Sequence, residues 1–456
     1  MDDSTRGIDL EPETIDAAMP DGLVLRRATR ETIRTALSPL EAAFGERWTD
    51  EWWSHRANAW DAGRIVTAFE GTLAVGCAGA ETFRLTVPGG EVPAAGLTLV
   101  GVRPTHRRRG ILRALMRQQL DEYRARGEPV SILWASEGAI YQRFGYGLAI
   151  IQASIEVERT RVAFLRPAET TGRMRTVDVD EAFGLFPPLY EVVRREVPGS
   201  LTRDETMWRL GLLWDEPSAA GEQGPKSLAV HESDGVPDGY VIYRMKPAWD
   251  GRGPKGELHI REIVGATPAV ELEVWRWVLD LDLVGRITGD RLPVPPTLLL
   301  ALTEPRRLGV TIGDGIWLRI LDVPAALEAR RFAAPGVVTL RVTDAFCPWN
   351  TGTWRIEVEE PATGEGPAGA GRPGRVTAVT AVPEGAAAGA AAGAAAVANE
   401  PDIDLDVADL GAAYLGGVRF SDLLAADRIR ELRAGAVRLA DAMFAADRTP
   451  ACATGF

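Results

Sequence analysis

An apolar run, a basic turn that contains glycine and an amphipathic pattern follow one another between residues 97 and 113, and this order constrains the fold most. Leu97–Val102 is rich in aliphatic residues and is followed by Pro104, which cannot extend a strand ladder. From Ile111 onward, apolar residues recur at helical spacing as far as Tyr123. The sequence therefore predicts a strand that ends before Pro104 and a helix that begins near residue 110.

The turn between these two elements, Arg107–Gly110, carries three consecutive arginines and a glycine. The first turn of a helix presents unpaired backbone N–H groups and the positive end of the helix dipole, and glycine allows close approach. An arginine triplet alone is more typical of a solvated helix cap or of a nucleic-acid contact. Because a strand leads directly into this turn, we interpret it as a pyrophosphate-binding site.

Three separate segments resemble a known family. Arg107–Leu112 is similar to the acyl-CoA-binding turn of the GCN5-related N-acetyltransferases, Gln/Arg-x-x-Gly-x-Gly/Ala, although Leu112 replaces the usual small residue, as it does in one branch. Trp134–Gly147, with its ending Tyr-x-Arg-Phe-Gly-Tyr-Gly, resembles the enhanced intracellular survival (Eis) acetyltransferases. The last residues, Thr454–Phe456, are also similar, because members of this family end on a phenylalanine whose carboxylate lies in the active site.

The resemblance implies an α/β (α+β) architecture with three domains, the number that a length of 456 residues also suggests. We expect an acetyl-CoA-binding N-acetyltransferase domain over 1–165 and a degenerate acetyltransferase-like domain without a cofactor site over 166–322, where no arginine–glycine turn occurs. A sterol-carrier-protein-like domain follows over 323–456. Within it, 361–399 is dominated by Gly, Ala and Pro, and we interpret it as a flexible insertion.

The remaining patterns predict the surrounding elements. In the first region we expect a strand over 23–26, helices between 30 and 60, a hairpin formed by 64–70 and 74–80, and a buried strand over 130–134. In the second region we expect helices between 180 and 213, strands over 227–231 and 240–245, and a helix over 268–280. In the third region we expect strands over 337–342, 353–358 and 403–407 and a helix over 423–443.

Composition narrows the class of protein and its partners. The chain has 51 Lys and Arg against 64 Asp and Glu, and this net charge of −13 argues against general nucleic-acid binding and favours cationic small molecules. The cysteines Cys77, Cys347 and Cys452 are widely spaced and histidines are few, so we expect no disulfide framework and no metal site. The N-terminus lacks a signal-peptide pattern, and Gly385–Ala398 is too weakly apolar to span a bilayer, so we expect a cytoplasmic protein without a membrane partner.

The resemblance also assigns contacts to acetyl-CoA, the expected co-substrate. Backbone groups of Val100, Gly101 and Val102 would pair with the pantetheine arm, although without the adjoining turn these residues would be read as a simple core strand. The pyrophosphate would be held by the turn and the helix start, namely Arg107, Arg108, Arg109, Gly110, Ile111, Leu112 and Arg113. Ser136 and Glu137, which follow the next strand, would border the coenzyme.

Two catalytic roles follow from the same resemblance. Tyr141 would be the general acid, since a tyrosine of pKa about 10 stays protonated at neutral pH and can donate to a thiolate whose conjugate acid has a pKa near 8.5. The terminal carboxylate of Phe456 would be the general base. A carboxylate of pKa about 3.5 is a weak base toward an ammonium group, so burial must raise its basicity or water must relay the proton. From composition alone, Tyr141 would be a packing residue and Phe456 a frayed chain end.

The acceptor is expected to be a primary amine of a polyamine, an aminoglycoside or a lysine side chain, and the relatives' assembly implies a homohexamer. One early segment, which contains Glu41, Phe44, Trp48, Asp50, Glu51, Trp52 and Trp53, combines acidic and aromatic groups suited to a cationic amine, but a solvated helix with an aromatic packing face explains it as well. Two other hypotheses stay open here. They are a non-catalytic acyl-CoA sensor or lipid carrier that retains the fold, and nucleic-acid binding through the arginine triplet.

Overall fold

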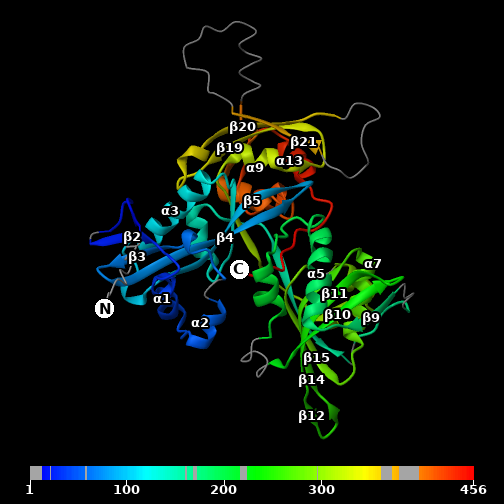
Figure 1. Cartoon of the computed structure of the whole chain (residues 1–456). Helices are drawn as coiled ribbons and strands as arrows, with labels where there is room; N and C mark the ends of the chain where they lie inside the picture. The colour runs from blue at the N-terminus through cyan, green and yellow to red at the C-terminus, as the bar shows by residue number, and fades with distance from the viewer. Residues whose placement is uncertain are drawn as a thin grey trace, which may run out of the picture. The chain divides into compact units, whose positions relative to one another are not determined.

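Figure 1 shows the computed structural model of the chain, which describes residues 13–20, 22–56, 59–159, 162–167, 172–215, 223–294, 296–360, 372–378 and 400–456. The chain forms two compact units. The first comprises Met1–Thr82, Ala95–Ser131 and Phe456, and the second comprises Phe83–Ala94 and Ile132–Gly455. No helix in the described part of the chain is long and apolar enough to cross a membrane.

A sheet forms the body of the first unit. Its strands neighbour one another in the order β1 (Thr14–Ile15), β2 (Leu23–Arg27), β3 (Val66–Glu70), β4 (Leu73–Val87) and β5 (Gly90–Val102). β2, β3 and β4 pair antiparallel, which confirms the predicted strand over 23–26 and the predicted hairpin. β4 and β5 extend further than predicted, into the second unit, because alternating buried residues such as Leu85 and Val92 continue the pattern of a half-buried strand.

Helices cover both faces of this sheet. They are α1 (Ile33–Phe44), α2 (Asp50–Arg56) and α3 (Ile111–Ala125), with short 3-10 turns at η1 (Ala62–Arg64) and η2 (Pro104–His106). A Cβ added to Gly101 would lie 2.8 Å from Leu40 of α1, whereas one added to Gly76 would lie 2.8 Å from Ile111 of α3 and 3.3 Å from Val102. Gly101 and Val102 are successive residues of β5, so their Cβ positions lie on opposite faces of the sheet. A Cβ at Gly76 would lie on the face of Val102, so α1 and α3 pack on opposite sides of the sheet. The glycines allow both helices to approach closely.

In the second unit, a short strand and a helix frame the motif that follows β6 (Val130–Trp134). The elements are α4 (Gly138–Tyr141), the 3-10 turn η3 (Gln142–Phe144), β7 (Gly147–Leu148), which pairs antiparallel with β17 (Ile316–Ile320), and α11 (Val407–Ala413). α11 lies against both β7 and β17. Segments that are more than 250 residues apart in sequence therefore build this part of the core together.

A seven-stranded sheet forms the next part of the second unit. Its order is β16 (Thr311–Asp314), β8 (Ile151–Glu158), β15 (Val284–Leu292), β14 (Gly256–Gly265), β11 (Val236–Lys246), β10 (Lys226–Ser233) and β9 (Gly172–Thr176). Its helical elements are α5 (Val179–Arg194), a π-helix over Met207–Leu213, α7 (Pro268–Leu279), α8 (Pro296–Ala301) and η6 (Pro305–Leu308). A small ribbon is formed by β12 (Trp249–Asp250) and β13 (Gly253–Pro254).

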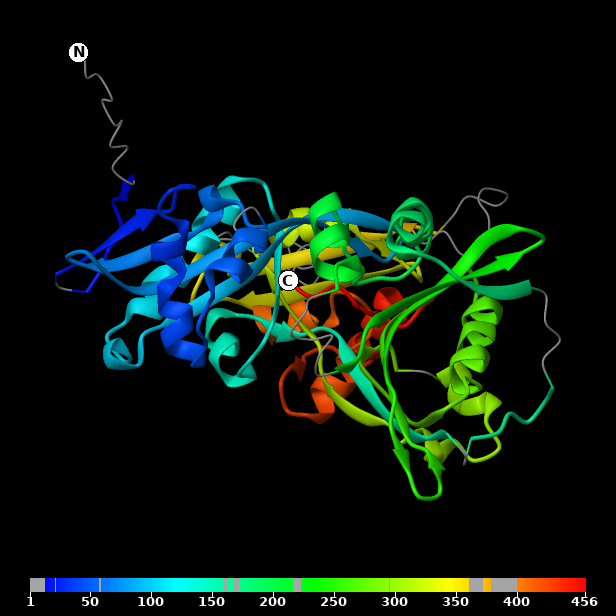
Figure 2. The ribbon, with the colours of Figure 1, turned by 60° about the horizontal axis from the view of Figure 1, so that its bottom comes forward.

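The two faces of this sheet carry separate cores, as Figure 2 shows for α7, which lies along one face. Val241 and Tyr243 of β11 pack with α7, whereas Tyr240 and Ile242 pack with α5 and the π-helix. β14 and β15 are parallel and are joined by α7, so this region contains a strand–helix–strand unit. The predicted strands over 227–231 and 240–245 and the predicted helix over 268–280 are confirmed. The predicted helical stretch between 180 and 213 is interrupted between α5 and the π-helix, where Pro198 and Gly199 stand.

The last region contains a five-stranded sheet in the order β22 (Arg375–Ala378), β20 (Gly352–Val358), β19 (Gly336–Thr343), β23 (Ile403–Asp406) and β24 (Arg430–Glu431). Its other elements are α9 (Val323–Ala329), β18 (Arg331–Phe332), β21 (Arg372–Pro373), η7 (Pro348–Asn350), α12 (Phe420–Ala425) and α13 (Ala436–Phe444). The strands predicted over 337–342, 353–358 and 403–407 are confirmed.

One expectation for this region needs correction. The single helix predicted over 423–443 is wrong, because the chain forms α12, then β24, which pairs with β23, and then α13. Asp427 and Gly435 adopt left-handed φ values of 56° and 85°, which end one helix and precede the next. The insertion predicted over 361–399 lies outside the described residues except for 372–378, where strand pairs form with β18 and β20. Val376 supplies a buried apolar position there.

Candidate active site

The basic turn follows β5 as predicted. β5 ends at Val102, a 3-10 turn spans Pro104–His106, and α3 begins at Ile111. Arg108 and Gly110 adopt left-handed φ values of 61° and 80°, a backbone conformation typical of tight turns, just before the helix. α3 has no capping side chain and no acidic residue in its first turn. Its first N–H groups and its dipole are therefore directed at a site that suits an anion.

The arginines of the turn differ in their partners. Arg109 donates to Glu70 Oε1 over 2.9 Å, and His106 Nε2 lies 3.2 Å from Glu70 Oε2, so β3 anchors the turn. These two partners lower the pKa of the Glu70 carboxyl. Arg107 and Arg108 are exposed and form no ion pair with any residue that the structure describes. Their positive charge is available to a ligand.

The strand before the turn is distorted at Leu99, which has a φ of 55°. A left-handed residue inside a strand breaks the regular ladder and is costly for a leucine. The Cys77 thiol contacts the Leu99 carbonyl oxygen at 3.3 Å from β4. Val100 and Val102 are half-buried and Gly101 is buried. The distortion therefore lies directly before the three residues whose backbone groups are expected to pair with a pantetheine arm.

Ser136, Glu137 and Tyr141 follow β6 in the second unit. Ser136 and Glu137 are exposed, and Glu137 is the residue that precedes α4. Tyr141 is only 7% exposed and packs edge-to-face on Tyr146, with ring centroids 6.0 Å apart. Burial, with a smaller contribution from the Glu137 charge, raises the pKa of Tyr141 to about 12. Its hydroxyl forms no hydrogen bond with the described residues, so it keeps its proton and has a free donor.

Close packing explains why glycine occupies positions 145 and 147, at the end of the Trp134–Gly147 motif. A Cβ at Gly145 would lie 2.1 Å from Arg319, whose guanidinium is buried and paired with Asp344 over 2.6 Å. A Cβ at Gly147 would lie 1.8 Å from the Ala408 carbonyl oxygen of α11. These glycines fix the backbone that carries Tyr141 against the C-terminal part of the chain. Phe144 and Tyr146 are buried packing residues, as the sequence indicates.

The C-terminal segment is ordered rather than frayed. Thr454 is buried, and its carbonyl oxygen accepts a hydrogen bond from Trp134 Nε1 over 2.9 Å. A Cβ at Gly455 would lie 2.6 Å from the Arg291 guanidinium, which itself stacks over Trp134 at 4.9 Å. Phe456 is half-buried. The residues that precede the expected catalytic carboxylate are therefore held in one position.

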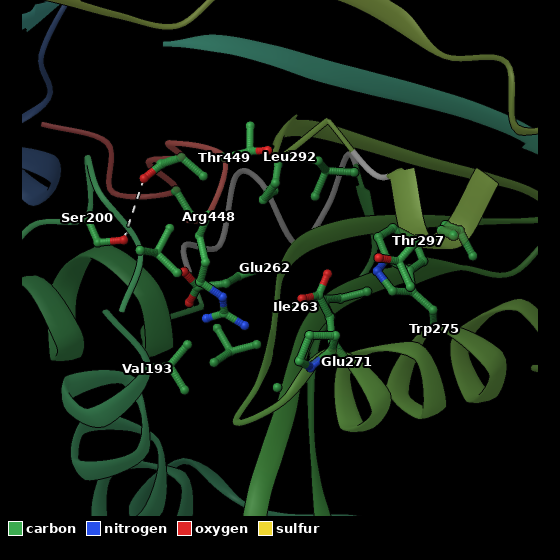
Figure 3. A pocket seen from close by; sticks show the side chains of 18 of the residues that line it. Val193, Ser200, Glu262, Ile263, Glu271, Trp275, Leu292, Thr297, Arg448 and Thr449 are labelled. Atoms are coloured by element: carbon green, nitrogen blue, oxygen red, sulfur yellow. Dashed lines mark hydrogen bonds between the residues drawn. The ribbon is translucent and has the colours of Figure 1, made fainter. Parts of the chain in front are cut away.

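A cavity of about 250 Å³, which was not predicted, opens in the second unit. β14 and β15 pair only as far as Ile260 and Gly289, and the cavity lies where they diverge, beside the start of α7. Figure 3 shows Arg448, from the C-terminal segment, pointing into this space. Glu271 lies in the first turn of α7, where the helix dipole favours a negative charge. Burial raises the pKa of its carboxyl. The parallel strand–helix–strand pattern was the sequence signal that could have indicated this cavity.

Four tryptophans gather in the first unit. Trp48 stacks on Trp52 at 5.0 Å, Trp53 lies 5.8 Å from Trp48, and Trp60 lies 6.1 Å from Trp52, all as ring-centroid distances. The rings are half-buried. Two of them already accept cations, because Arg34 stands over Trp53 and Arg56 over Trp52 at 5.8 and 5.5 Å. Trp60 is the member of this group that lies outside the segment predicted from the sequence.

The cysteines and histidines of the described residues are spread widely along the chain. In those ranges no group of three or more His, Cys, Asp or Glu side chains could hold a metal ion. Cys77, Cys347 and Cys452 are buried free thiols. Burial raises the pKa of Cys77 and of Cys452 to about 12, so neither is a nucleophile at neutral pH.

Comparison with known proteins identifies the parts of the chain. Models described as an acetyltransferase (GNAT) domain match residues 24–149 and, separately, residues 199–320. A sterol carrier protein domain model matches residues 323–453. These matches confirm the predicted fold class, with two acetyltransferase-like folds and a sterol-carrier-like fold. The predicted domain boundaries themselves stay predictions.

Relatives of known name cover most of the chain. It is 38% identical over 395 residues to an uncharacterized N-acetyltransferase of Streptomyces avermitilis, covering 86% of this chain and 89% of the relative. It is 36% identical over 386 residues to the N-acetyltransferase Eis of Mycobacterium tuberculosis, covering 83% and 84%. The crystal structure of Eis1 from Mycobacterium abscessus superposes with a TM-score of 0.76 at 30% identity, over 95% of this chain and all of that one.

Proposed function

Because the chain belongs to the Eis family of GCN5-related N-acetyltransferases and is an N-acetyltransferase, we propose that it transfers acetyl from acetyl-CoA directly to a primary amine of a cationic acceptor. Acetyl-CoA is the co-substrate that the acetyltransferase fold implies. The observation that supports this proposal most is the strand, basic turn and uncapped helix start formed by Val100–Arg113.

In this proposal the turn binds the pyrophosphate of acetyl-CoA. Arg107, Arg108 and Arg113 supply positive charge at the N-terminus of α3, and Gly110 allows the phosphate to approach backbone N–H groups. Arg109 contributes less, because its charge is already compensated by Glu70. Ile111 and Leu112 contribute only their N–H groups, and the Ile111 side chain is buried against Gly76.

The pantetheine arm would lie along β5 after its distortion at Leu99. Val100, Gly101 and Val102 would pair with the amides of the arm through their backbone groups, which orients the thioester. Ser136 and Glu137 would border the coenzyme, and their exposure after β6 is compatible with this role. Holding the thioester in one orientation lowers the entropic part of the barrier.

The reaction needs no covalent enzyme intermediate. The amine nitrogen attacks the thioester carbonyl carbon, the oxyanion forms, and the C–S bond then breaks as the thiolate takes a proton. We assign that proton to Tyr141, whose raised pKa keeps it protonated at neutral and moderately alkaline pH. The amine proton leaves to the carboxylate of Phe456, directly or through water. The products are the N-acetylated amine and coenzyme A.

The acceptor site is supported by the charge of the chain and by the four tryptophans. The net charge of −13 attracts cations. The ring faces of Trp52 and Trp53 bind guanidinium groups, which shows that their faces suit a cation. An aminoglycoside, a polyamine or a lysine side chain meets these requirements. The homohexamer is likewise a proposal, and light scattering on the purified protein would test it.

Acetyl-CoA binding by calorimetry tests the first part of this proposal. The double variant Arg107→Ala/Arg108→Ala should bind acetyl-CoA at least about tenfold more weakly, since the loss of even one charge-assisted contact costs about 1.5–3 kcal/mol. Arg117→Ala is the matched control, because Arg117 lies on the same helix beyond the first turn and pairs with Asp121. Equal affinity of the double variant and the wild type would refute this pyrophosphate site.

A further inference from the structure

A group of buried polar side chains in the second unit converges on one residue of the C-terminal segment. Thr454 Oγ1 accepts a hydrogen bond from Arg203 Nε over 2.9 Å and lies 3.2 Å from the Tyr190 hydroxyl. Its carbonyl oxygen accepts the Trp134 indole N–H over 2.9 Å. Three side chains from different parts of the chain therefore converge on this one residue.

Arg203 belongs to an ion pair that is almost completely buried. Its two terminal nitrogens donate to Glu262 over 3.0 and 2.6 Å, and the two side chains are 0% and 2% exposed. The Tyr240 hydroxyl donates to the same carboxylate over 2.9 Å. The Arg203 guanidinium also stacks over Tyr190 at 3.8 Å. All three nitrogens of the guanidinium therefore donate hydrogen bonds, two to Glu262 and one to Thr454.

A buried ion pair of this kind contributes little net stability to a fold. The desolvation of two buried charges commonly offsets their attraction, and apolar residues of similar volume do as well or better. What a fully satisfied buried network provides is one fixed geometry. Here the group that this geometry fixes is on the C-terminal segment, two residues before the end of the chain.

The segment is held at a second point as well. Ala451 N donates to the Pro198 carbonyl oxygen over 2.9 Å, and Ser200 Oγ lies 3.5 Å from the Ala451 carbonyl oxygen, the dashed contact in Figure 3. Arg448, Thr449 and Ala453 line the cavity between the diverging strands β14 and β15. The segment thus lies along the acetyltransferase-like fold of residues 199–320, and that fold determines its path.

We propose that Arg203, with Trp134 and Tyr190, is a positioning device that fixes the register of the C-terminal segment, and that the second acetyltransferase-like fold serves to hold it. The inference rests on the proposed role of the Phe456 carboxylate as general base. Two residues span at most about 7 Å, so a fixed Thr454 confines that carboxylate to a small region. A free chain end would sample many positions, and a displacement of about 1 Å costs up to about 100-fold in rate.

The test uses the pair of substitutions Trp134→Phe and Thr454→Val, which together remove the indole donor and the hydroxyl and leave Arg203 paired with Glu262. We expect kcat for amine acetylation to fall about 10- to 100-fold while KM for acetyl-CoA stays within about twofold. Thr454→Ser, which keeps the hydroxyl, should stay within about threefold of the wild type. A rise in KM for acetyl-CoA with unchanged kcat would overturn the inference. An equal loss of kcat in Thr454→Ser would also overturn it.

Release of the C-terminal residue by carboxypeptidase gives a second test that does not depend on activity. Carboxypeptidase should release Phe456 from the folded double variant about tenfold faster or more than from the wild type, because the last residues are no longer held at Thr454. Deletion of Phe456 separates the two proposals. If the deletion leaves the rate unchanged, the proposed base is wrong and the inference falls with it. If the deletion abolishes the rate while the double variant matches the wild type in rate and in carboxypeptidase release, only the positioning role is refuted.

Discussion

Replacing Tyr141 with phenylalanine removes one hydroxyl and little else. The ring is 7% exposed and packs on Tyr146, and the hydroxyl forms no hydrogen bond with the residues that the structure describes. Phenylalanine keeps the ring and its edge-to-face contact, so no buried partner is left unsatisfied. We therefore expect the free energy of unfolding at neutral pH to change by less than about 0.5 kcal/mol. A loss of rate in this variant reports on chemistry rather than on folding.

The size of the expected loss follows from the proton that Tyr141 supplies. A pKa of about 12 lies about 3.5 units above that of a thiol, so complete transfer to the thiolate is uphill by about 4.8 kcal/mol. The proton must therefore be transferred while the C–S bond is breaking, before a free thiolate has formed. General acid catalysis of this kind contributes about 10²- to 10⁴-fold. Tyr141→Phe should lose that factor in kcat and keep its affinity for acetyl-CoA.

The assay is release of coenzyme A thiol in the presence of a saturating amine, with acetyl-CoA affinity measured by calorimetry. Tyr146→Phe is the matched control, since it removes a hydroxyl from the neighbouring ring of the same motif. Tyr146 is fully buried, so this control should lose stability and keep kcat/KM within about threefold. A Tyr141→Phe enzyme that runs within about threefold of the wild type would refute the assignment of the general acid.

Three further outcomes follow from the structure. Gly147→Ala should lower the free energy of unfolding in urea by about 1–3 kcal/mol, because the added methyl meets a backbone carbonyl, whereas Gly184→Ala, with open space around it, should raise it by up to about 1 kcal/mol. The wild type should lose stability as pH rises from 10 to 12, since folded Tyr141 keeps its proton to about pH 12 and the unfolded chain releases it near 10; the loss should be smaller in Tyr141→Phe, and equal losses would count against the raised pKa. Cys77 and Cys452 should resist alkylation at pH 8 in the folded protein and react after denaturation, as mass spectrometry would show.

Local sequence patterns predicted the parts of this fold that depend on local physics. The end of the strand before Pro104 and the start of the helix after Gly110 are set by periodicity and by two residues of restricted or unusual backbone geometry, and these two boundaries were predicted within a residue. The predicted helix over 423–443 failed for a non-local reason. Arg430 and Glu431 pair with β23, which no pattern within that segment announces. Tertiary pairing overrode the apolar spacing there.

The site residues divide in the same way. The basic turn is a local feature and is found from the sequence alone. The environment of Tyr141 is not, because its burial depends on contacts of Gly145 and Gly147 with Arg319 and α11, far along the chain. Likewise, nothing near Thr454 indicates that Arg203 and Trp134 hold it. These relationships join segments hundreds of residues apart and appear only in the folded chain.

Acetyl transfer from acetyl-CoA to an amine underlies every role proposed above. It is tested most directly by thiol release from acetyl-CoA with an aminoglycoside, a polyamine, a lysine-containing peptide and no amine, with the products weighed by mass spectrometry. We predict release that depends on at least one amine, with one or more acetyl groups added to it. Binding of acetyl-CoA without release of thiol for any of these amines, or release at the same rate without amine, would contradict the proposal.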